Sequence, residues 1–202
     1  MRVTLDDRPC EISPRNVGEA IAEAADLAGR DGRIIVEVLV DGSPWSETEL
    51  AEPENVTREA EDVQLTSADP RELVTQTLQQ ADEALEMIAT HQSAAAEHIQ
   101  SNRAADAMEQ LNEAITLWMS VQQVVQRGTQ VLDIDLDQVT VGNKPVNTYI
   151  EQLNDRLRLL RDQLQAQDHL GLADTLMYDL PEVVDAWSQL IQGLRKHVGE
   201  GE

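Results

Sequence analysis

The chain has 202 residues and a formal net charge of −23, with 38 Asp and Glu against 15 Lys and Arg. Phosphate backbones and anionic membrane surfaces would repel such a protein, so we expect no nucleic-acid binding. Hydrophobic residues make up 41% of the chain but aromatic residues only 2%. The core must therefore consist of aliphatic side chains, which favours helix-on-helix packing.

The cysteine content and the hydropathy pattern limit the cellular setting. Cys10 is the single cysteine, which excludes an intrachain disulfide and a cysteine metal site. The first residues lack the apolar stretch of a signal peptide, and no run of about 18 apolar residues occurs. We therefore expect a cytoplasmic protein without membrane insertion.

The N-terminal residues predict a hairpin followed by a helix. "MRVTL" and "RPCEI" flank Asp6-Asp7 and read as two short antiparallel strands, with Pro9 at a sheet edge. Asn16 suits a helix N-cap, and Glu19 completes a capping box. A stripe of small and aliphatic residues follows, and "GRDG" at 29–32 ends the helix. The members of the stripe are Ile21, Ala24, Ala25 and Leu27.

Two further strands complete this part of the chain. "RIIVEVLV", residues 33–40, is the strongest strand signal and is closed by Asp41-Gly42. The acidic stretch from Glu47 to Glu61 predicts a loop or a short helical turn, and "DVQLT" predicts a last strand. The order ββαββ on so short a segment predicts a β-grasp-like (ubiquitin-like) domain over residues 1–68.

A helical period begins at residue 69, where we place a second domain covering 69–202. Asp69 suits an N-cap and Pro70 the first helical position. Four apolar series follow with steps of three and four residues, which is typical of near-antiparallel helix packing. Short connections at 101–102 and 168–171, with one longer crossover over 128–145, predict an antiparallel four-helix bundle.

Two of these series concern the candidate site. The second ends at Gly128 and consists of Ala104, Met108, Leu111, Ile115, Trp118, Gln122 and Val125. The fourth consists of Leu172, Leu176, Leu180, Val183, Trp187, Leu190 and Leu194. We expect both series to face the core.

Pro181 interrupts the fourth helix and has an aromatic residue on either side. The apolar series continues past Pro181, so we expect the helix to continue with a bend, because proline removes a donor and clashes with the carbonyl of Met177. Tyr178 and Trp187 would then pack at the bend. The alternative is that these two aromatic residues form a binding site.

The same segment carries a resemblance to a known family. "HLGLADTLMYDLPEVVDAW" (169–187), after the helix "YIEQLNDRLRLLRDQLQAQD", resembles the C-terminal part of an uncharacterised bacterial family with the pattern L-A-D-x-L-x-Y-E-L-x-P-x-x-x-x-W. The matching positions are Leu172, Ala173, Asp174, Leu176, Tyr178, Leu180 and Trp187. Asp179 departs from the family's Glu, and Pro181 stands one residue early. The resemblance implies a helical fold and a bacterial origin, but no activity.

"DIDLD" at 133–137 is the segment most like a metal site. Asp133, Asp135 and Asp137 match the opening of an EF-hand loop, but Gln138 and Lys144 stand where that loop needs Gly and Glu. We therefore interpret the segment as extended, with its apolar residues packed and its aspartates solvated. We expect no metal and no cofactor.

The sequence contains none of the common catalytic motifs. His91 and His98 are seven residues apart, roughly 10 Å along a helix, which is too far to share one metal. G-x-S-x-G, the P-loop, G-x-G-x-x-G and H-E-x-x-H do not occur. We therefore expect no enzymatic activity, and we predict no catalytic residue.

Two polar residues interrupt the apolar series. Gln92 and Gln122 could fix the register of the helices, or lie where a partner helix docks. The simpler interpretation, which we favour, is that each lies near a solvated end of its series.

These patterns favour a non-catalytic interaction or adaptor protein that binds an amphipathic partner helix, in an arrangement similar to bacterial export chaperones. The acidic surface favours a basic partner. The candidate contact residues are Tyr178, Trp187, Gln92, Gln122 and Met177.

Two alternatives remain beside this interpretation. One is a homo-oligomer or homodimer that buries Leu159, Met177 and Val184 against a second copy. The other, less favoured, is an enzyme with an unrecognised carboxylate site.

Overall fold

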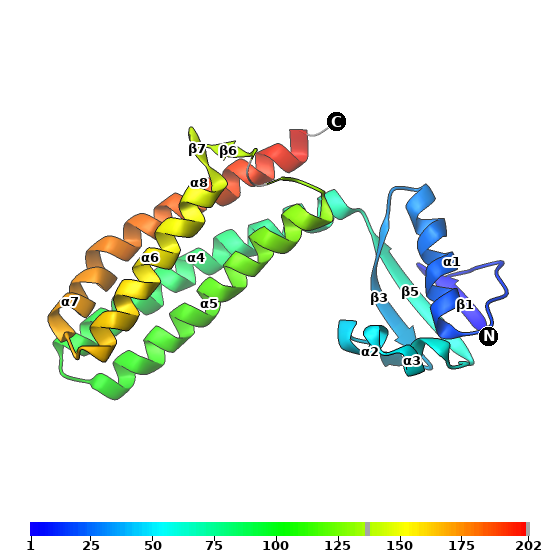
Figure 1. Cartoon of the computed structure of the whole chain (residues 1–202), viewed down its shortest axis with the longest axis horizontal. Helices are drawn as coiled ribbons and strands as arrows, with labels where there is room; N and C mark the ends of the chain where they lie inside the picture. Colours follow the sequence, from blue (N-terminus) through cyan, green and yellow to red (C-terminus); the bar gives the residue numbers. More distant parts are fainter. Residues whose placement is uncertain (136–137, 201–202) are drawn as a thin grey trace. The chain divides into compact units, whose positions relative to one another are not determined.

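The computed structural model describes residues 1–135 and 138–200 (Figure 1). The chain divides into two compact units, Met1–Leu73 and Val74–Glu202, and each unit has a hydrophobic core. The fold is mixed α+β, because the first unit contains a five-stranded sheet and helices dominate the second.

A helix and two short helical turns accompany the sheet of the first unit. Its elements are β1 (Arg2–Leu5), β2 (Arg8–Pro9), α1 (Val17–Arg30), β3 (Ile34–Val40), β4 (Ser43–Pro44), α2 (Glu47–Ala51), α3 (Pro53–Thr57) and β5 (Asp62–Ala68). The strand order is β2-β1-β5-β3-β4. β1 and β5 are parallel, whereas the other neighbouring strands are antiparallel.

Tight turns set the register of the two hairpins. Asp6 and Asp7 have φ of 51° and 61°, and Asp41 and Gly42 have φ of 51° and 79°. Positive φ at both central residues defines the turn that matches the twist of a two-residue hairpin. The predicted hairpin is therefore present, although its second strand is only two residues long, and Pro9 lies on the sheet edge.

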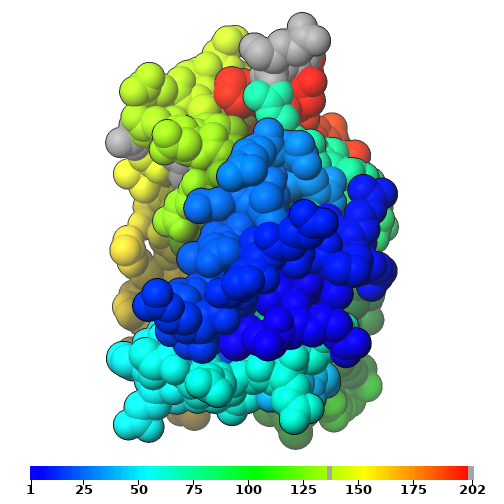
Figure 2. All heavy atoms as spheres, turned by 90° about the vertical axis from the view of Figure 1, so that its right-hand side faces the viewer, coloured from blue at the N-terminus to red at the C-terminus, as the bar shows by residue number. Residues whose placement is uncertain are grey.

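Capping side chains start α1 and α2 of the first unit. The Asn16 side chain accepts a hydrogen bond from the Glu19 N–H at 2.8 Å, but the Glu19 carboxylate accepts from Arg15 rather than from Asn16. Ser46 and Glu49 form a reciprocal capping box at α2, where a loop or a helical turn was expected. α3 lies beside the start of α1, since the Val17 N–H donates to Arg58 (Figure 2).

The face of α1 that meets the sheet differs from the predicted stripe. Of that stripe only Ala24 is buried; Ile21 and Leu27 are half-buried and Ala25 is exposed. Small side chains dominate the face because they let the helix approach the sheet closely. The buried residues are Val17, Ala20, Ala24 and Ala28.

The second unit is built from long helices. Its elements are α4 (Pro70–Gln100), α5 (Ala104–Val131), β6 (Thr140–Val141), β7 (Lys144–Pro145), α6 (Val146–Gln165), α7 (His169–Asp174), η1 (Thr175–Asp179) and α8 (Leu180–Glu200). Asp69 caps α4 as predicted, because its carboxylate accepts from the N–H groups of Arg71 and Glu72. Asn102, with φ of 56°, makes the expected turn between α4 and α5.

Hydrogen bonds connect each long helix to its neighbours. His91 of α4 forms a hydrogen bond with Gln110 of α5 at 2.8 Å, and Trp187 Nε1 of α8 donates to the Tyr149 carbonyl of α6 at 3.2 Å. Gln122 of α5 forms a hydrogen bond with Asn154 of α6, and Ser188 of α8 forms one with Asp82 of α4. Buried residues from all four helices form one core.

The predicted core face of α5 is shifted in the structure. Leu111, Trp118 and Val125 are buried as expected, but Met108 is exposed and Ile115 only half-buried. Small residues take the other core positions, because alanine and glycine allow neighbouring helices to come close. The buried residues of α5 are Ala107, Leu111, Ala114, Trp118, Val121, Val125, Gly128 and Thr129.

Two glycines allow close packing inside the second unit. Gly128 does not end α5, which continues to Val131; a Cβ at Gly128 would lie 3.1 Å from a methyl of Val74. At Gly193 of α8 a Cβ would collide with the side chain of Val141, so this glycine lets the β6–β7 hairpin approach α8. The Tyr149 hydroxyl donates to the Val141 carbonyl at 2.8 Å.

The chain remains helical through Pro181, but it does so by way of a π-helical turn. η1 comes directly before α8, and the Leu180 N–H donates to the carbonyl of Thr175, five residues earlier. A π turn inserts one extra residue into a helix. The spacing Leu172–Leu176–Leu180 contains two steps of four residues, and the inserted residue keeps all three side chains in the core.

Candidate functional site

The two aromatic residues that flank Pro181 lie in opposite environments. Trp187 is 1% exposed and meets Trp118 edge to face, with ring centroids 5.5 Å apart. Its Nε1 donates to the Tyr149 carbonyl at 3.2 Å. Tyr178 is 66% exposed, so the expectation that both rings pack at a bend is wrong for Tyr178.

Tyr178 belongs to an exposed apolar patch on α7 and η1. We define the α7–η1 patch as Leu170, Met177 and Tyr178. Leu170 is 82% exposed, and Met177 is also exposed. The Nε2 of Gln100, at the end of α4, donates to the Met177 sulfur at 3.0 Å. The patch therefore lies where α4 meets the π turn.

A groove runs between α4 and α8, and we call it the α4–α8 groove. Its volume is about 550 Å³. Its apolar lining residues are Ala89, which is exposed, and Leu85 and Val184, which are buried. The Ser188 hydroxyl donates across the groove to the Asp82 carboxylate at 2.7 Å.

The groove carries a strong negative charge. Asp82, Glu83 and Glu86 lie on its α4 side and Asp185 on its α8 side. Among the described residues that line the groove, Arg195 is the one cation. Within the described residues, the Glu86 and Asp185 carboxylates take part in no hydrogen bond or ion pair. These two groups can therefore accept bonds from a ligand.

The groove and the patch both lie beside α4, which pairs with α8 along the groove and contacts η1 beyond it. Arg195 donates to Gln79 at 3.5 Å near one end of the groove, and Gln100 contacts Met177 further along α4. A ligand that follows α4 and α8 could therefore touch the acidic rim and Met177 together.

The two glutamines lie away from this surface. Gln92 is 2% exposed, and among the described residues neither its Nε2 nor its Oε1 has a hydrogen-bond partner. The interpretation of Gln92 as a solvated end of its series is therefore wrong. Gln122 is half-buried and donates to Asn154 Oδ1 at 3.4 Å.

The structure thus brings together only two of the five predicted contact residues. Met177 and Tyr178 are neighbours on the surface, whereas Trp187 and Gln92 lie in the core. Partner binding stays a prediction for all five residues. The sequence interpretation missed the groove carboxylates, whose signal was the acidic cluster at 82–86.

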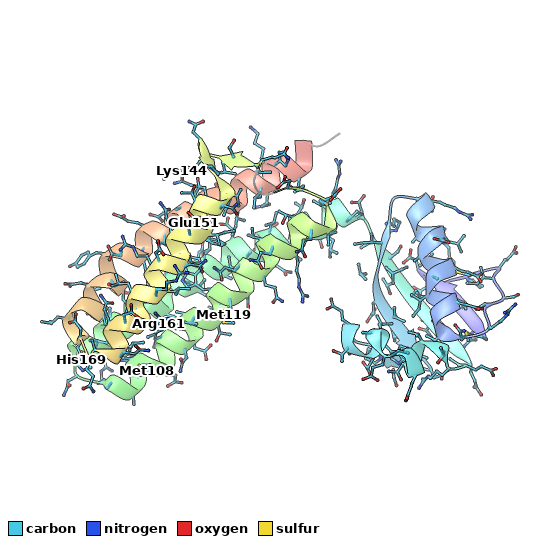
Figure 3. The ribbon with its side chains drawn as sticks, in the orientation of Figure 1. Met108, Met119, Lys144, Glu151, Arg161 and His169 are labelled. Atoms are coloured by element: carbon cyan, nitrogen blue, oxygen red, sulfur yellow. The ribbon has the colours of Figure 1, made fainter. Side chains whose placement is uncertain are left out.

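The predicted self-association face is not continuous. Val184 belongs to the core and Leu159 is half-buried, while Met177 is exposed. Other large apolar side chains are exposed elsewhere: Met108 and Met119 project from α5, as Figure 3 shows. A contact between two copies of the chain would therefore be better explained by Met108 and Met119 than by the predicted face.

The "DIDLD" segment shows the predicted burial pattern where it is described, but its start is not extended, because Asp133 has φ of 53° in the turn that ends α5. Leu132 and Ile134 pack against the core, whereas Asp133 and Asp135 are exposed; residues 136 and 137 lie outside the described ranges. Over the described residues, no group of three or more His, Cys, Asp or Glu side chains could hold a metal ion.

The first unit has a hollow of about 590 Å³ with balanced charges. Arg8, Arg30 and Arg33 line it together with three acids, Asp6, Glu11 and Asp31. The hydroxyl of Ser67 donates a hydrogen bond to the Asp6 carboxylate and lowers its pKa, and the Ser67 N–H adds a smaller effect in the same direction. Burial raises the pKa of the Cys10 thiol in the same lining, which disfavours the nucleophilic thiolate.

Comparison with known proteins places the helical unit in a family. Residues 76–190 match the family described as Domain of unknown function (DUF8042). The match covers more than half of the chain, so the chain belongs to this family. The predicted membership in an uncharacterised domain family is thereby confirmed, while its bacterial origin stays a prediction.

The other comparisons add no relative. No curated protein and no solved structure matches the chain. None of the helices within the described ranges combines the length and the apolar character needed to cross a membrane.

Proposed function

We propose that this chain is a non-catalytic interaction or adaptor protein whose helical unit binds a basic, amphipathic helix of a protein partner. The observation that carries the proposal is the α4–α8 groove, whose acidic rim borders an apolar lining. A partner helix in the groove would place a small apolar side chain against the exposed Ala89, next to the buried Leu85 and Val184. Its Lys and Arg side chains would meet Glu86 and Asp185.

The α7–η1 patch supports the same proposal. Large apolar side chains that gather on a surface mark interaction sites. The flexible thioether of Met177 can adapt to different partner side chains. Because Met177 lies beyond one end of the groove, a partner helix longer than the groove would gain an apolar contact there.

The proposal includes a fold and a cellular setting. The hydrogen bonds that join the four long helices in a ring support an antiparallel four-helix bundle. The strand order β2-β1-β5-β3-β4, with β1 and β5 parallel, supports a β-grasp-like first unit. We place the protein in a bacterial cytoplasm, in a role similar to that of a helical export chaperone.

A defined peptide tests the proposal. The probe is a fluorescent helical peptide with Leu and Ala on one face and Lys on the other, and its binding is measured by anisotropy. Replacing Glu83, Glu86 and Asp185 together by Gln, Gln and Asn should weaken binding about tenfold, because each exposed ion pair contributes about 0.2–1 kcal/mol.

A matched variant controls for net charge. Glu109→Gln, Glu113→Gln and Glu151→Gln change the charge equally on exposed positions of α5 and α6, and together they should alter binding less than about twofold. Equal weakening by both triple variants would mean that overall charge, not the groove, attracts the peptide. A peptide with Glu in place of Lys should not bind.

A second candidate function is self-association through α5. The exposure of Met108 and Met119 favours it, since apolar side chains left on one helix can be covered by a second copy. Light scattering decides between the two. A stable dimer that Met119→Ser dissociates would support self-association, whereas a monomer leaves the groove proposal in place.

A further inference from the structure

Several buried polar groups in the helical unit lack hydrogen-bond partners. Within the described residues, they include Nε2 and Oε1 of Gln92, Nδ1 of His98 and Oε1 of Gln163. The carboxylate nearest to His98 belongs to Asp106, and at 3.9 Å it is beyond hydrogen-bond range. Trp118 Nε1 is also unpaired, but its ring packs in the middle of the core.

One of these residues, Gln163, contacts the α7–η1 segment, which we define as residues 169–179, and Gln92 lies near the end of this segment. Gln163 donates to Thr175 of this segment. On α4, the contacts of Asp82 with Ser188 and of Gln100 with Met177 lie on either side of Gln92. Because α4 and α8 are antiparallel, Gln92 lies level with the first turn of α8, directly after the segment.

The backbone of the segment is weaker than that of an ordinary helix. α7 has six residues and continues into the π turn, whose hydrogen bonds span five residues instead of four. Pro181, which follows, has no N–H to donate. The helical hydrogen-bond ladder is therefore interrupted between the segment and α8.

We propose that the α7–η1 segment opens as a local unit while the rest of the helical unit stays folded. Opening would let water reach the unpaired groups of Gln92 and Gln163, which relieves the cost of burying them unpaired. Opening would also cost free energy, because Leu172 and Leu176 would leave the core and expose apolar surface to water. The opening needs no partner, so it goes beyond the proposed function.

Native-state amide hydrogen exchange of the full chain tests this proposal. In the wild type, amides of residues 170–180 should exchange at least about tenfold faster than those of residues 183–198. Gln92→Leu removes the unpaired amide but keeps the side chain's bulk. It should slow exchange at 170–180 by about tenfold or more, because opening would no longer relieve the cost of an unpaired buried group. The exchange rates of residues 170–180 and 183–198 should therefore become more similar.

Gln122→Leu is the matched control, because it removes a half-buried amide that has a partner, Asn154. It should leave exchange at 170–180 within about twofold of the wild type. Gln92→Met repeats the test should Gln92→Leu misfold. Equal exchange rates in both segments of the wild type would overturn the proposal, as would equal slowing of both segments by Gln92→Leu. Peptide binding plays no part in this readout, so the proposed function can fail independently.

Discussion

Replacing Trp187 by Ala should strongly destabilise the helical unit. At 1% exposure, the ring removes nearly its whole surface from water. About 150–250 Å² at about 25 cal/mol per Å² gives an upper bound of about 4–6 kcal/mol. Replacing a buried aromatic residue by Ala costs about 3–5 kcal/mol of stability. This cost includes the lost edge-to-face contact with Trp118. We expect a loss of about 4 kcal/mol.

Urea unfolding followed by far-ultraviolet circular dichroism measures this loss, because the helical unit dominates that signal. Tyr178→Ala is the matched control: it removes the other aromatic ring beside Pro181, which is 66% exposed, and should cost less than about 0.5 kcal/mol. A loss below about 1 kcal/mol for Trp187→Ala would refute the core position of Trp187. So would similar losses for the two variants.

Two further changes test the packing of α8 and the electrostatics of the sheet. Gly193→Ala should destabilise the second unit by about 1–3 kcal/mol, because its Cβ meets Val141, whereas Gly199→Ala, with open space around it, should raise thermal stability slightly. The pKa of Asp6 lies below 3.8 in the folded state because Ser67 donates to it, so its stabilising contribution is present above pH 3.8 and is lost as the pH falls through the lowered pKa. Ser67→Ala should move this pKa back toward 3.8 in an NMR titration, and an unchanged pKa would contradict the assignment.

Local signals made the element boundaries predictable. Asp69 and Pro70 begin α4 because a capping side chain and a fixed φ act within a few residues of the backbone they shape. Asn102 makes the turn before α5 for the same kind of local reason. The capping box of Ser46 and Glu49 was an equally local signal, and it would have identified α2.

The core face of α5 could not be read from apolar spacing alone. Two alternative core faces of α5 both contain Leu111, Trp118 and Val125, and they differ in the residues that lie between these three. The sequence interpretation favoured the bulkier Met108, whereas the structure buries Ala107 and Ala114. Helix separation decides between the sets, because small side chains permit a close approach, and this separation is set by the neighbouring helices.

The π turn left a trace in the sequence that was misinterpreted. Two consecutive steps of four residues, Leu172 to Leu176 to Leu180, are one residue too long for the alternating spacing of the other series. Together with Pro181, this excess predicts an inserted residue. The expected bend instead took the apolar spacing as regular through Pro181, with one hydrogen bond lost at the proline and no residue inserted.

The groove depends on contacts that spacing along the chain does not reveal. The carboxylates at 82–86 become part of a site because α8 brings Asp185 and Val184 beside them, from about a hundred residues away. The sequence interpretation pointed to aromatic residues instead. Trp187 turned inward because its indole N–H finds the Tyr149 carbonyl inside the core.

Chemical-shift mapping tests the central claim most directly. The isotope-labelled full chain is titrated with the Leu, Ala and Lys peptide, and the amide shifts are followed residue by residue. Binding in the α4–α8 groove predicts the largest shifts at residues 79–89 and 177–195, and small ones on α5. Shifts concentrated around Met108 and Met119, or no saturable shifts at all, would contradict it.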